Sequence, residues 1–258
     1  MKFLVTGDSF TKGHGLDHEK DDPFLWVNQL IRSQYPGAEI VNKAETGIDN
    51  KTIFGITCQE LITNDYDFTL VCWSSLMRKC YNFGLELYHT RTMLNGLHHD
   101  ININPNISIS AKDIASAGEF LMKYHNDHWS LIDLVLYSNV LTKLTKNICF
   151  VSGLSCIEEN FFKRKIIKAP SDLSKFEQEL LSIDTRDDQE IFDLYNKIHI
   201  DYENNGGIQE KYWLNLYNSL IQMQIDNVSK NDAHPGYKSQ NVYFNKLYDK
   251  FCERVNAS

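Results

Sequence analysis

The chain has 258 residues, 42% of them hydrophobic, and a formal net charge of −8 at pH 7. This hydrophobic content is sufficient for a core and excludes an intrinsically disordered protein. The negative charge argues against nonspecific binding to nucleic-acid phosphates. The sequence contains no run of 18 apolar residues and begins without a secretory signal, so we expect a cytoplasmic protein that does not contact a membrane.

Strand and helix signals alternate along most of the chain. Short apolar runs ended by turn residues indicate strands, and apolar residues at three- and four-residue spacing indicate helices. Asp22 and Pro23 suit the start of the first helix, as cap and first-turn residue. The predicted elements are a strand at 2–7, a helix at 22–36, strands at 38–44 and 67–73 on either side of a helix at 50–64, a helical stretch at 115–147, a strand at 148–154 and a C-terminal helix after residue 236.

This alternation predicts one domain, residues 1–258, with a three-layer α/β/α, flavodoxin-like fold around a parallel sheet. Two segments interrupt it. Residues 79–110 are rich in Tyr, His and Asn, and the stretch 98–110 (HHDININPNISIS) indicates an irregular or hairpin excursion. Residues 155–230 indicate a large helical insertion, in which 212–224 (YWLNLYNSLIQMQ) carries apolar residues at helical spacing.

Polar residues follow the predicted strands at the edge where open parallel sheets bind their ligands. Ser9 comes directly after the first strand, between Gly7 and Gly13. Asp232 and His234 lie in a predicted loop before the last helix. A serine hydroxyl becomes nucleophilic when an imidazole takes its proton, and a carboxylate orients that imidazole. The pattern therefore indicates nucleophilic catalysis.

The motifs around these residues resemble those of the SGNH hydrolases, also called the GDSL esterase/lipase family. “GDSFTKG” is similar to the first block of that family, “AETGIDN” to the second and “NDAHPG” to the last, in the right order. The resemblance covers residues 1–78 and about 228–254. It implies the α/β/α fold and an ester hydrolase without a cofactor or a metal.

The resemblance also implies a role for each matching residue. Ser9 would be the nucleophile, His234 the base and Asp232 the group that orients His234. The backbone N–H groups of Ser9 and Gly47 would donate to the oxyanion, where charge develops only in the transition state.

The chain departs from the family pattern at two places. The third block, Gly-x-Asn-Asp, normally supplies an asparagine to the oxyanion hole, but the corresponding stretch here is “VCWSSLMR”. The candidate substitutes are Ser74, Ser75 and Arg78, or Asn50 reaching in from the second block. The family spaces its Asp and His three residues apart, whereas Asp232 and His234 are two apart.

These observations leave more than one function open. The first is a serine esterase or O-deacylase, or an acyl transferase using the same serine, that acts on a small or carbohydrate-like ester. The second is a non-catalytic SGNH-like module that binds a ligand or partner. A phosphodiester hydrolase is disfavoured because the sequence lacks a dense Arg/Lys cluster. The oligomeric state stays open.

Histidine spacing raises a metal site as an alternative. His125 and His128, and likewise His14 and His18, stand at spacings that zinc ligands use. The first pair falls in an amphipathic helix and the second in a glycine-flanked loop, so we assign no metal. The six cysteines lack a C-x-x-C spacing and are interpreted as reduced thiols. The abundance of Asn, Lys and Ile with few prolines is typical of low-GC bacterial or phage coding.

Overall fold

The computed structural model describes residues 1–76, 80–83, 86–89, 127–154, 204 and 206–257. Arg78 lies outside the described residues, as do His125 and most of the two segments predicted as insertions.

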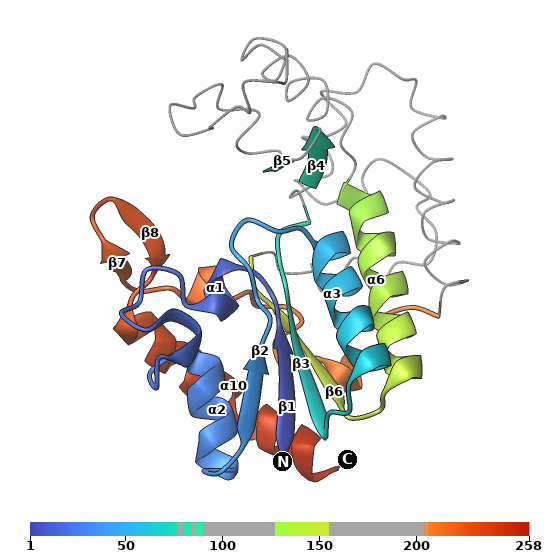
Figure 1. Cartoon of the computed structure of the whole chain (residues 1–258), viewed down its shortest axis with the longest axis horizontal. Coiled ribbons are helices and arrows are strands. Elements are labelled where there is room, and N and C mark those ends of the chain that lie inside the picture. Colours follow the sequence, from blue (N-terminus) through green and yellow to red (C-terminus); the bar gives the residue numbers. More distant parts are fainter. Residues whose placement is uncertain (77–79, 84–85, 90–126, 155–203, 205, 258) are drawn as a thin grey trace, which may run out of the picture.

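The centre of the fold is a four-stranded parallel sheet (Figure 1). Its strands are β1 (Lys2–Thr6), β2 (Glu39–Asn42), β3 (Phe68–Trp73) and β6 (Ile148–Ser152), in the order β2-β1-β3-β6. The flavodoxin-like sheet has the same order over its first four strands. β3 and β6 are buried at every residue, as expected for strands covered on both faces. The predicted parallel α/β fold is confirmed.

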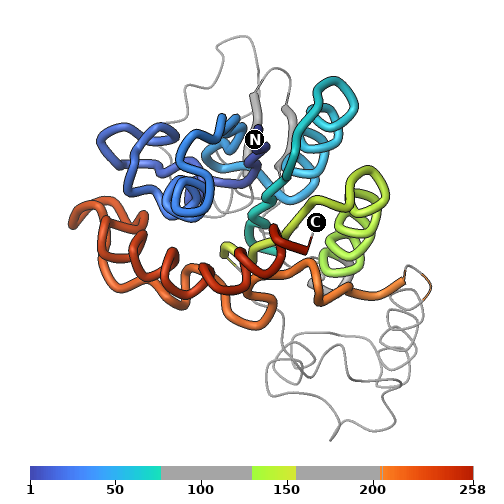
Figure 2. Tube along the Cα trace, turned by 90° about the horizontal axis from the view of Figure 1, so that it is seen from below, coloured from blue at the N-terminus to red at the C-terminus, as the bar shows by residue number. Residues whose placement is uncertain are grey.

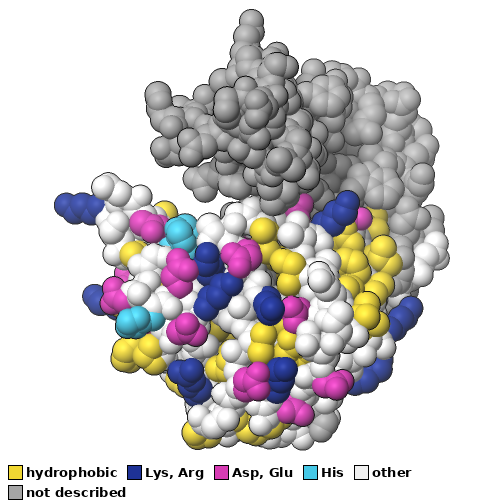
Figure 3. Space-filling view, viewed as in Figure 1, with side chains coloured by type: hydrophobic (Ala, Val, Ile, Leu, Met, Phe, Trp, Pro, Cys, Tyr) yellow, Lys and Arg dark blue, Asp and Glu magenta, His cyan; other side chains and the backbone are white. Residues whose placement is uncertain are grey.

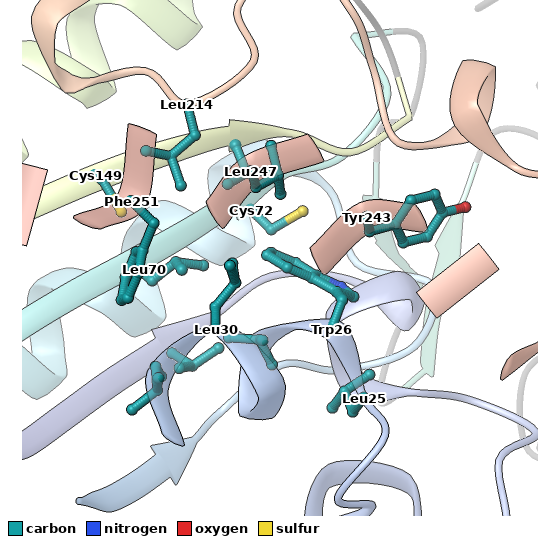
Figure 4. Packing of buried hydrophobic residues seen from close by; sticks show 14 of the residues in the cluster. Leu25, Trp26, Leu30, Leu70, Cys72, Cys149, Leu214, Tyr243, Leu247 and Phe251 are labelled. Carbon is teal, nitrogen blue, oxygen red and sulfur yellow. The ribbon is translucent and has the colours of Figure 1, made fainter. Parts of the chain in front are cut away.

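Helices cover both faces of this sheet. Helices α2 (Trp26–Gln34) and α10 (Tyr237–Asn256) pack on one face, and α3 (Asn50–Thr63) and α6 (Asp127–Leu144) pack on the other (Figure 2). Each face has its own apolar cluster. The cluster beneath α2 and α10 is drawn in Figure 4 and includes Trp26, Leu30, Cys72, Cys149, Tyr243, Leu247 and Phe251. The three-layer arrangement follows from these two cores.

The first long helix begins later than its sequence predicted. Asp22 does not cap α2; its carboxylate accepts a hydrogen bond from the Phe24 backbone N–H (2.8 Å) in the preceding turn. The helix begins at Trp26, whose backbone N–H donates to the Gln240 side chain (3.1 Å). The acceptor that starts α2 therefore comes from α10, which is distant in the sequence.

The prediction of a helix over residues 212–224 is wrong. The segment contains two short 3₁₀ turns, Glu210–Tyr212 and Ile221–Met223, and between them it runs beside β6. Trp213 forms a parallel bridge with Phe150, and the Leu214 N–H donates to the Phe150 carbonyl (2.9 Å). The apolar residues of this segment thus bury themselves at the position that a fifth strand would hold.

Two hairpins complete the described structure. β4 (Cys80–Phe83) pairs with β5 (Glu86–His89). The stretch 98–110, for which an irregular or hairpin excursion is predicted, lies outside the described residues. β7 (Asn227–Ser229) pairs with β8 (Asp232–Pro235), where the sequence predicted a loop. A membrane-crossing helix, long and apolar enough to span a bilayer, is not found among the described residues.

Candidate active site

Ser9 opens a short helix at the carboxyl end of β1. Helix α1 (Ser9–Lys12) is capped by Asp8, whose carboxylate accepts from the Phe10 N–H (3.1 Å). Gly7 allows the chain to turn tightly, because a Cβ at this position would lie 2.6 Å from the Thr11 hydroxyl oxygen. Ser9 is 3% exposed. The turn therefore holds the serine at the sheet edge, where it is almost fully buried.

Asp232 and His234 form a paired carboxylate and imidazole on β8. Asp232 Oδ1 lies 2.5 Å from His234 Nδ1 and also accepts the backbone N–H of His234 (3.0 Å). That backbone N–H, with the imidazole as a further contribution, holds the pKa of Asp232 below its ordinary value despite partial burial. The carboxylate is therefore ionised at neutral pH and fixes the orientation of the ring.

Two buried side chains bring this pair against α1. Trp26 Nε1 donates to the carbonyl of Phe10 (3.2 Å), and Gln240 Nε2 donates to the carbonyl of Pro235 (3.2 Å), next to His234. The rings of Phe10 and His234 lie 6.3 Å apart, centroid to centroid. Ser9 therefore directly precedes, in the sequence, the residue whose ring lies near the imidazole. Within the described residues, Ser9 Oγ and His234 are not joined by a hydrogen bond.

The loop after β2 runs beside the end of β1. The Glu45 N–H donates to the Gly7 carbonyl (3.0 Å), which brings Gly47 to the same edge of the sheet. Gly47 has φ +83°, a left-handed conformation that glycine adopts without strain. This is the loop from which the sequence predicted the second oxyanion donor.

Asn50 and Ser74 bind each other. Asn50 Oδ1 accepts the backbone N–H of Ser74 (2.7 Å), and Asn50 Nδ2 donates to the Ser74 carbonyl (3.4 Å). Both residues are buried, and the pair joins the start of α3 to the end of β3. The structure thus brings these two predicted residues together through the Ser74 backbone.

His14, which the sequence raised only as a candidate metal ligand together with His18, also lies at this edge. Its ring meets the His234 ring edge-on, with centroids 4.6 Å apart. His14 Nδ1 also lies 3.5 Å from a Glu19 carboxylate oxygen and 3.4 Å from the Thr46 hydroxyl. The sequence showed its spacing from His18 but not its contact with His234, because that contact links opposite ends of the chain.

Ion pairs tie the His14 loop to the loop after β2. Lys12 Nζ lies 3.5 Å from Glu19 and 3.6 Å from Glu45, and Lys20 Nζ lies 2.8 Å from Glu45. The hydrogen bond from Lys20 is the main cause of the lowered pKa of Glu45. Basic and acidic side chains are interspersed over the described part of this face (Figure 3). The charge around the site is therefore mixed in sign.

No protein-family model matches the chain, and no curated protein matches it. Solved structures align over nearly its whole length at low identity. TesA aligns over 98% of this chain and 99% of its own, with 10% identity and a TM-score of 0.44. A lipolytic protein of the G-D-S-L family from Veillonella parvula aligns over 96% and 97%, with 10% identity and a TM-score of 0.41.

The esterase EstA from Pseudoalteromonas aligns over 99% of this chain and 98% of its own, with 13% identity and a TM-score of 0.43. The description of the Veillonella structure names the family that the sequence motifs resemble. At these TM-scores, the likeness does not contribute to the functional argument. That argument rests on the residues of this chain.

Proposed function

We propose that this chain is a serine ester hydrolase of the SGNH type. The observation that carries the proposal is the Asp232–His234 pair, with 2.5 Å between Oδ1 and Nδ1, held against the helix that Ser9 opens. The carboxylate and imidazole on β8 lie beside the short helix α1, which carries the serine at the carboxyl edge of the parallel sheet. This edge is where such sheets bind their ligands.

Each residue of the triad has one role in the proposed reaction. Ser9 Oγ attacks the ester carbonyl carbon while His234 takes the hydroxyl proton at Nε2. Asp232 accepts the hydrogen bond from Nδ1–H and stabilises the imidazolium that forms. The imidazolium then gives its proton to the departing alcohol, which leaves an acyl group on Ser9. Water, or an acceptor hydroxyl, attacks that acyl group in the reverse sequence and restores the serine.

The serine hydroxyl and imidazole are not hydrogen-bonded in the described structure, and this is compatible with the proposed mechanism. In free enzymes, catalytic hydrogen bonds are often long and tighten when substrate binds. The low exposure of Ser9, which is 3%, supports a short acyl group. The polar residues around it support an ester of a polar alcohol, such as a carbohydrate.

The proposed oxyanion hole uses the backbone N–H groups of Ser9 and Gly47. Asn50 binds both backbone polar groups of Ser74, so we assign it to fixing the loop after β3. Arg78 stays a prediction, since it lies outside the described residues. A hole that lacks one donor loses roughly 3 kcal/mol of transition-state stabilisation. The proposed enzyme is therefore slow compared with one that has three donors.

A small fluorophosphonate, diisopropyl fluorophosphate, tests the proposal. We expect one covalent adduct on Ser9 of the wild type, detected by intact-protein mass spectrometry and peptide mapping. Ser9→Ala and His234→Ala should remain unmodified. Ser33→Ala is the matched control, since Ser33 lies on the exposed side of α2 and its hydroxyl binds the Leu30 carbonyl. A folded wild-type protein without an adduct contradicts the hydrolase and favours the binding module.

A further inference from the structure

Two histidines and one carboxylate converge beside α1. His14, Asp232 and His234 each offer one ligand atom, and these atoms all lie within 4.8 Å of one another. The ligand atoms of a tetrahedral zinc site lie about 3.4 Å apart, because each bond is about 2.0–2.1 Å long. Closing the three groups around an ion therefore requires movements of about 1.5 Å or less, which side-chain rotations provide.

The surroundings of His14 match those of a metal-binding histidine. Histidine ligands commonly place their second ring nitrogen against a carboxylate or another hydrogen-bonding group, which fixes the tautomer. His14 Nδ1 has both kinds of neighbour: Glu19 at 3.5 Å and Thr46 at 3.4 Å. Because these neighbours engage Nδ1, Nε2 is the ring nitrogen of His14 that is left to bind an ion.

All three side chains are partly accessible. The exposed fraction is 39% for His14, 27% for His234 and 29% for Asp232. An ion can therefore reach the group without unfolding the chain. The loop that carries His14 is held in place by the ion pairs of Lys12 with Glu19 and Glu45.

We propose that His14, Asp232 and His234 bind a zinc ion reversibly, and that the bound ion blocks the proposed catalytic base. Imidazole nitrogens favour borderline metals such as Zn²⁺, whereas Mg²⁺ and Ca²⁺ prefer sites built from oxygen ligands. Two histidines and one carboxylate leave a fourth position for water. Each protein ligand donates a lone pair to the ion, and no electrons are transferred.

The inhibition rests on the proposed function, because a zinc-bound imidazole has no free lone pair for the proton of Ser9. Zinc binding and general-base catalysis by His234 thus exclude each other. A chelator restores the base by removing the ion. The binding of zinc itself does not depend on whether Ser9 is catalytic.

Competition with a chromophoric zinc chelator, checked by calorimetry, measures the binding. We expect one Zn²⁺ per wild-type chain and no binding of Mg²⁺ at the same concentration. His14→Asn should raise the dissociation constant by at least about 100-fold, and Glu19→Gln by about 10-fold or more. His18→Asn is the matched control: His18 is an exposed histidine of the same loop and lies outside the cluster, so its variant should bind like the wild type.

The fluorophosphonate reaction measures the block. Each variant is compared with its own zinc-free rate, and we expect stoichiometric Zn²⁺ to stop the labelling of wild type and His18→Asn but not of His14→Asn. An unchanged dissociation constant in His14→Asn overturns the metal site. Zinc binding that leaves wild-type labelling unchanged overturns the block. If zinc binds as expected but zinc-free wild type is never labelled, the metal site stands and the hydrolase proposal fails.

Discussion

Asp232 accepts two hydrogen bonds from His234, one from its backbone and one from its ring. The carboxylate oxygen Oδ1 accepts both the backbone N–H and Nδ1 of His234. The first bond fixes the turn of the chain, and the second fixes the ring. The two-residue separation between Asp and His therefore gives the same side-chain contact that a catalytic carboxylate needs. The geometry, rather than the spacing in the sequence, defines a triad.

Asp232→Asn is expected to lower the rate of fluorophosphonate labelling by about 10⁴-fold. The amide presents either a donor to Nδ1 or a weaker, neutral acceptor, so the imidazole loses the tautomer that accepts the serine proton. Labelling kinetics at neutral pH measure the effect, and circular dichroism checks that the fold is kept. A decrease of less than tenfold in a folded variant contradicts the role of Asp232 in orienting the imidazole.

The sequence identified those residues whose role depends on neighbours nearby in the chain. Ser9 follows a strand and lies among glycines, and Asp232 and His234 are neighbours. The contacts of His14 with His234 and of Gln240 with Trp26 were missed because each joins residues more than 200 positions apart. Nothing in the local pattern around Gln240 distinguishes a buried bridging amide from a surface residue of a helix.

The hairpin that carries Asp232 and His234 is fastened to the start of α10 by Asp226. Its carboxylate accepts the backbone N–H groups of Lys238 (3.1 Å) and Ser239 (2.7 Å) and the Ser239 hydroxyl (2.5 Å). These N–H groups belong to the first turn of the helix, where intrahelical acceptors are absent. Asp226 thus caps α10 from outside the helix and positions β8 at the same time.

Asp226→Asn is expected to lower the free energy of unfolding by about 1 kcal/mol at pH 7. Burial raises the pKa of Asp226, but the hydrogen bonds from Ser239 and Lys238 outweigh it, so the folded-state pKa lies below the ordinary value of 3.8. A lowered folded pKa means that the stabilisation is complete above the unfolded pKa and is lost as pH falls through the folded pKa.

Urea unfolding of wild type and Asp226→Asn at a series of pH values measures this difference. The two stabilities should converge as the pH falls below 3.8, because the wild-type carboxylate then becomes protonated and neutral like the amide. A difference that keeps its full size through this range contradicts the assignment of the effect to the ionised carboxylate.

Among the elements, the buried strands were predicted best. The run 67–73 is apolar almost throughout, and β3 occupies Phe68–Trp73. Residues 212–224 were mispredicted because apolar residues at helical spacing also suit an irregular segment that packs its side chains on a sheet edge. The hydrogen bonds to Phe150 and Ser152, which settle the conformation, come from β6.

Across the whole molecule, the strand order places the catalytic candidates. The order reverses between β1 and β3, so the chain winds to opposite faces of the sheet from this point. Ser9 follows β1 and Ser74 follows β3, on either side of that point. The alternation of strands and helices predicted the fold class, but the pairing of β6 with residues 213–214 required the assembled sheet.

Two cysteines in the apolar cluster beneath α2 and α10 report on the opening of the whole fold. Cys72 on β3 and Cys149 on β6 are fully buried in it (Figure 4), and burial raises the pKa of both thiols. Cys58 and Cys252 are only partly buried. We expect alkylation to be at least about 10³-fold slower at the buried pair in native protein, because their exposure requires unfolding of the cluster.

Pulsed alkylation across a urea titration, read by peptide mass spectrometry, tests whether this cluster opens as one unit. Cys72 and Cys149 should become reactive with the same midpoint as the loss of helical circular dichroism, because α2 and α10 cover both residues. The alkylation rates of Cys58, Cys72, Cys149 and Cys252 in concentrated guanidinium chloride supply the unfolded-state reference for each thiol. Reaction of Cys149 at a lower urea concentration than Cys72 would show that the β6 edge opens separately. Residues 213–214, which pair with β6, would then not stabilise that edge as a fifth strand would.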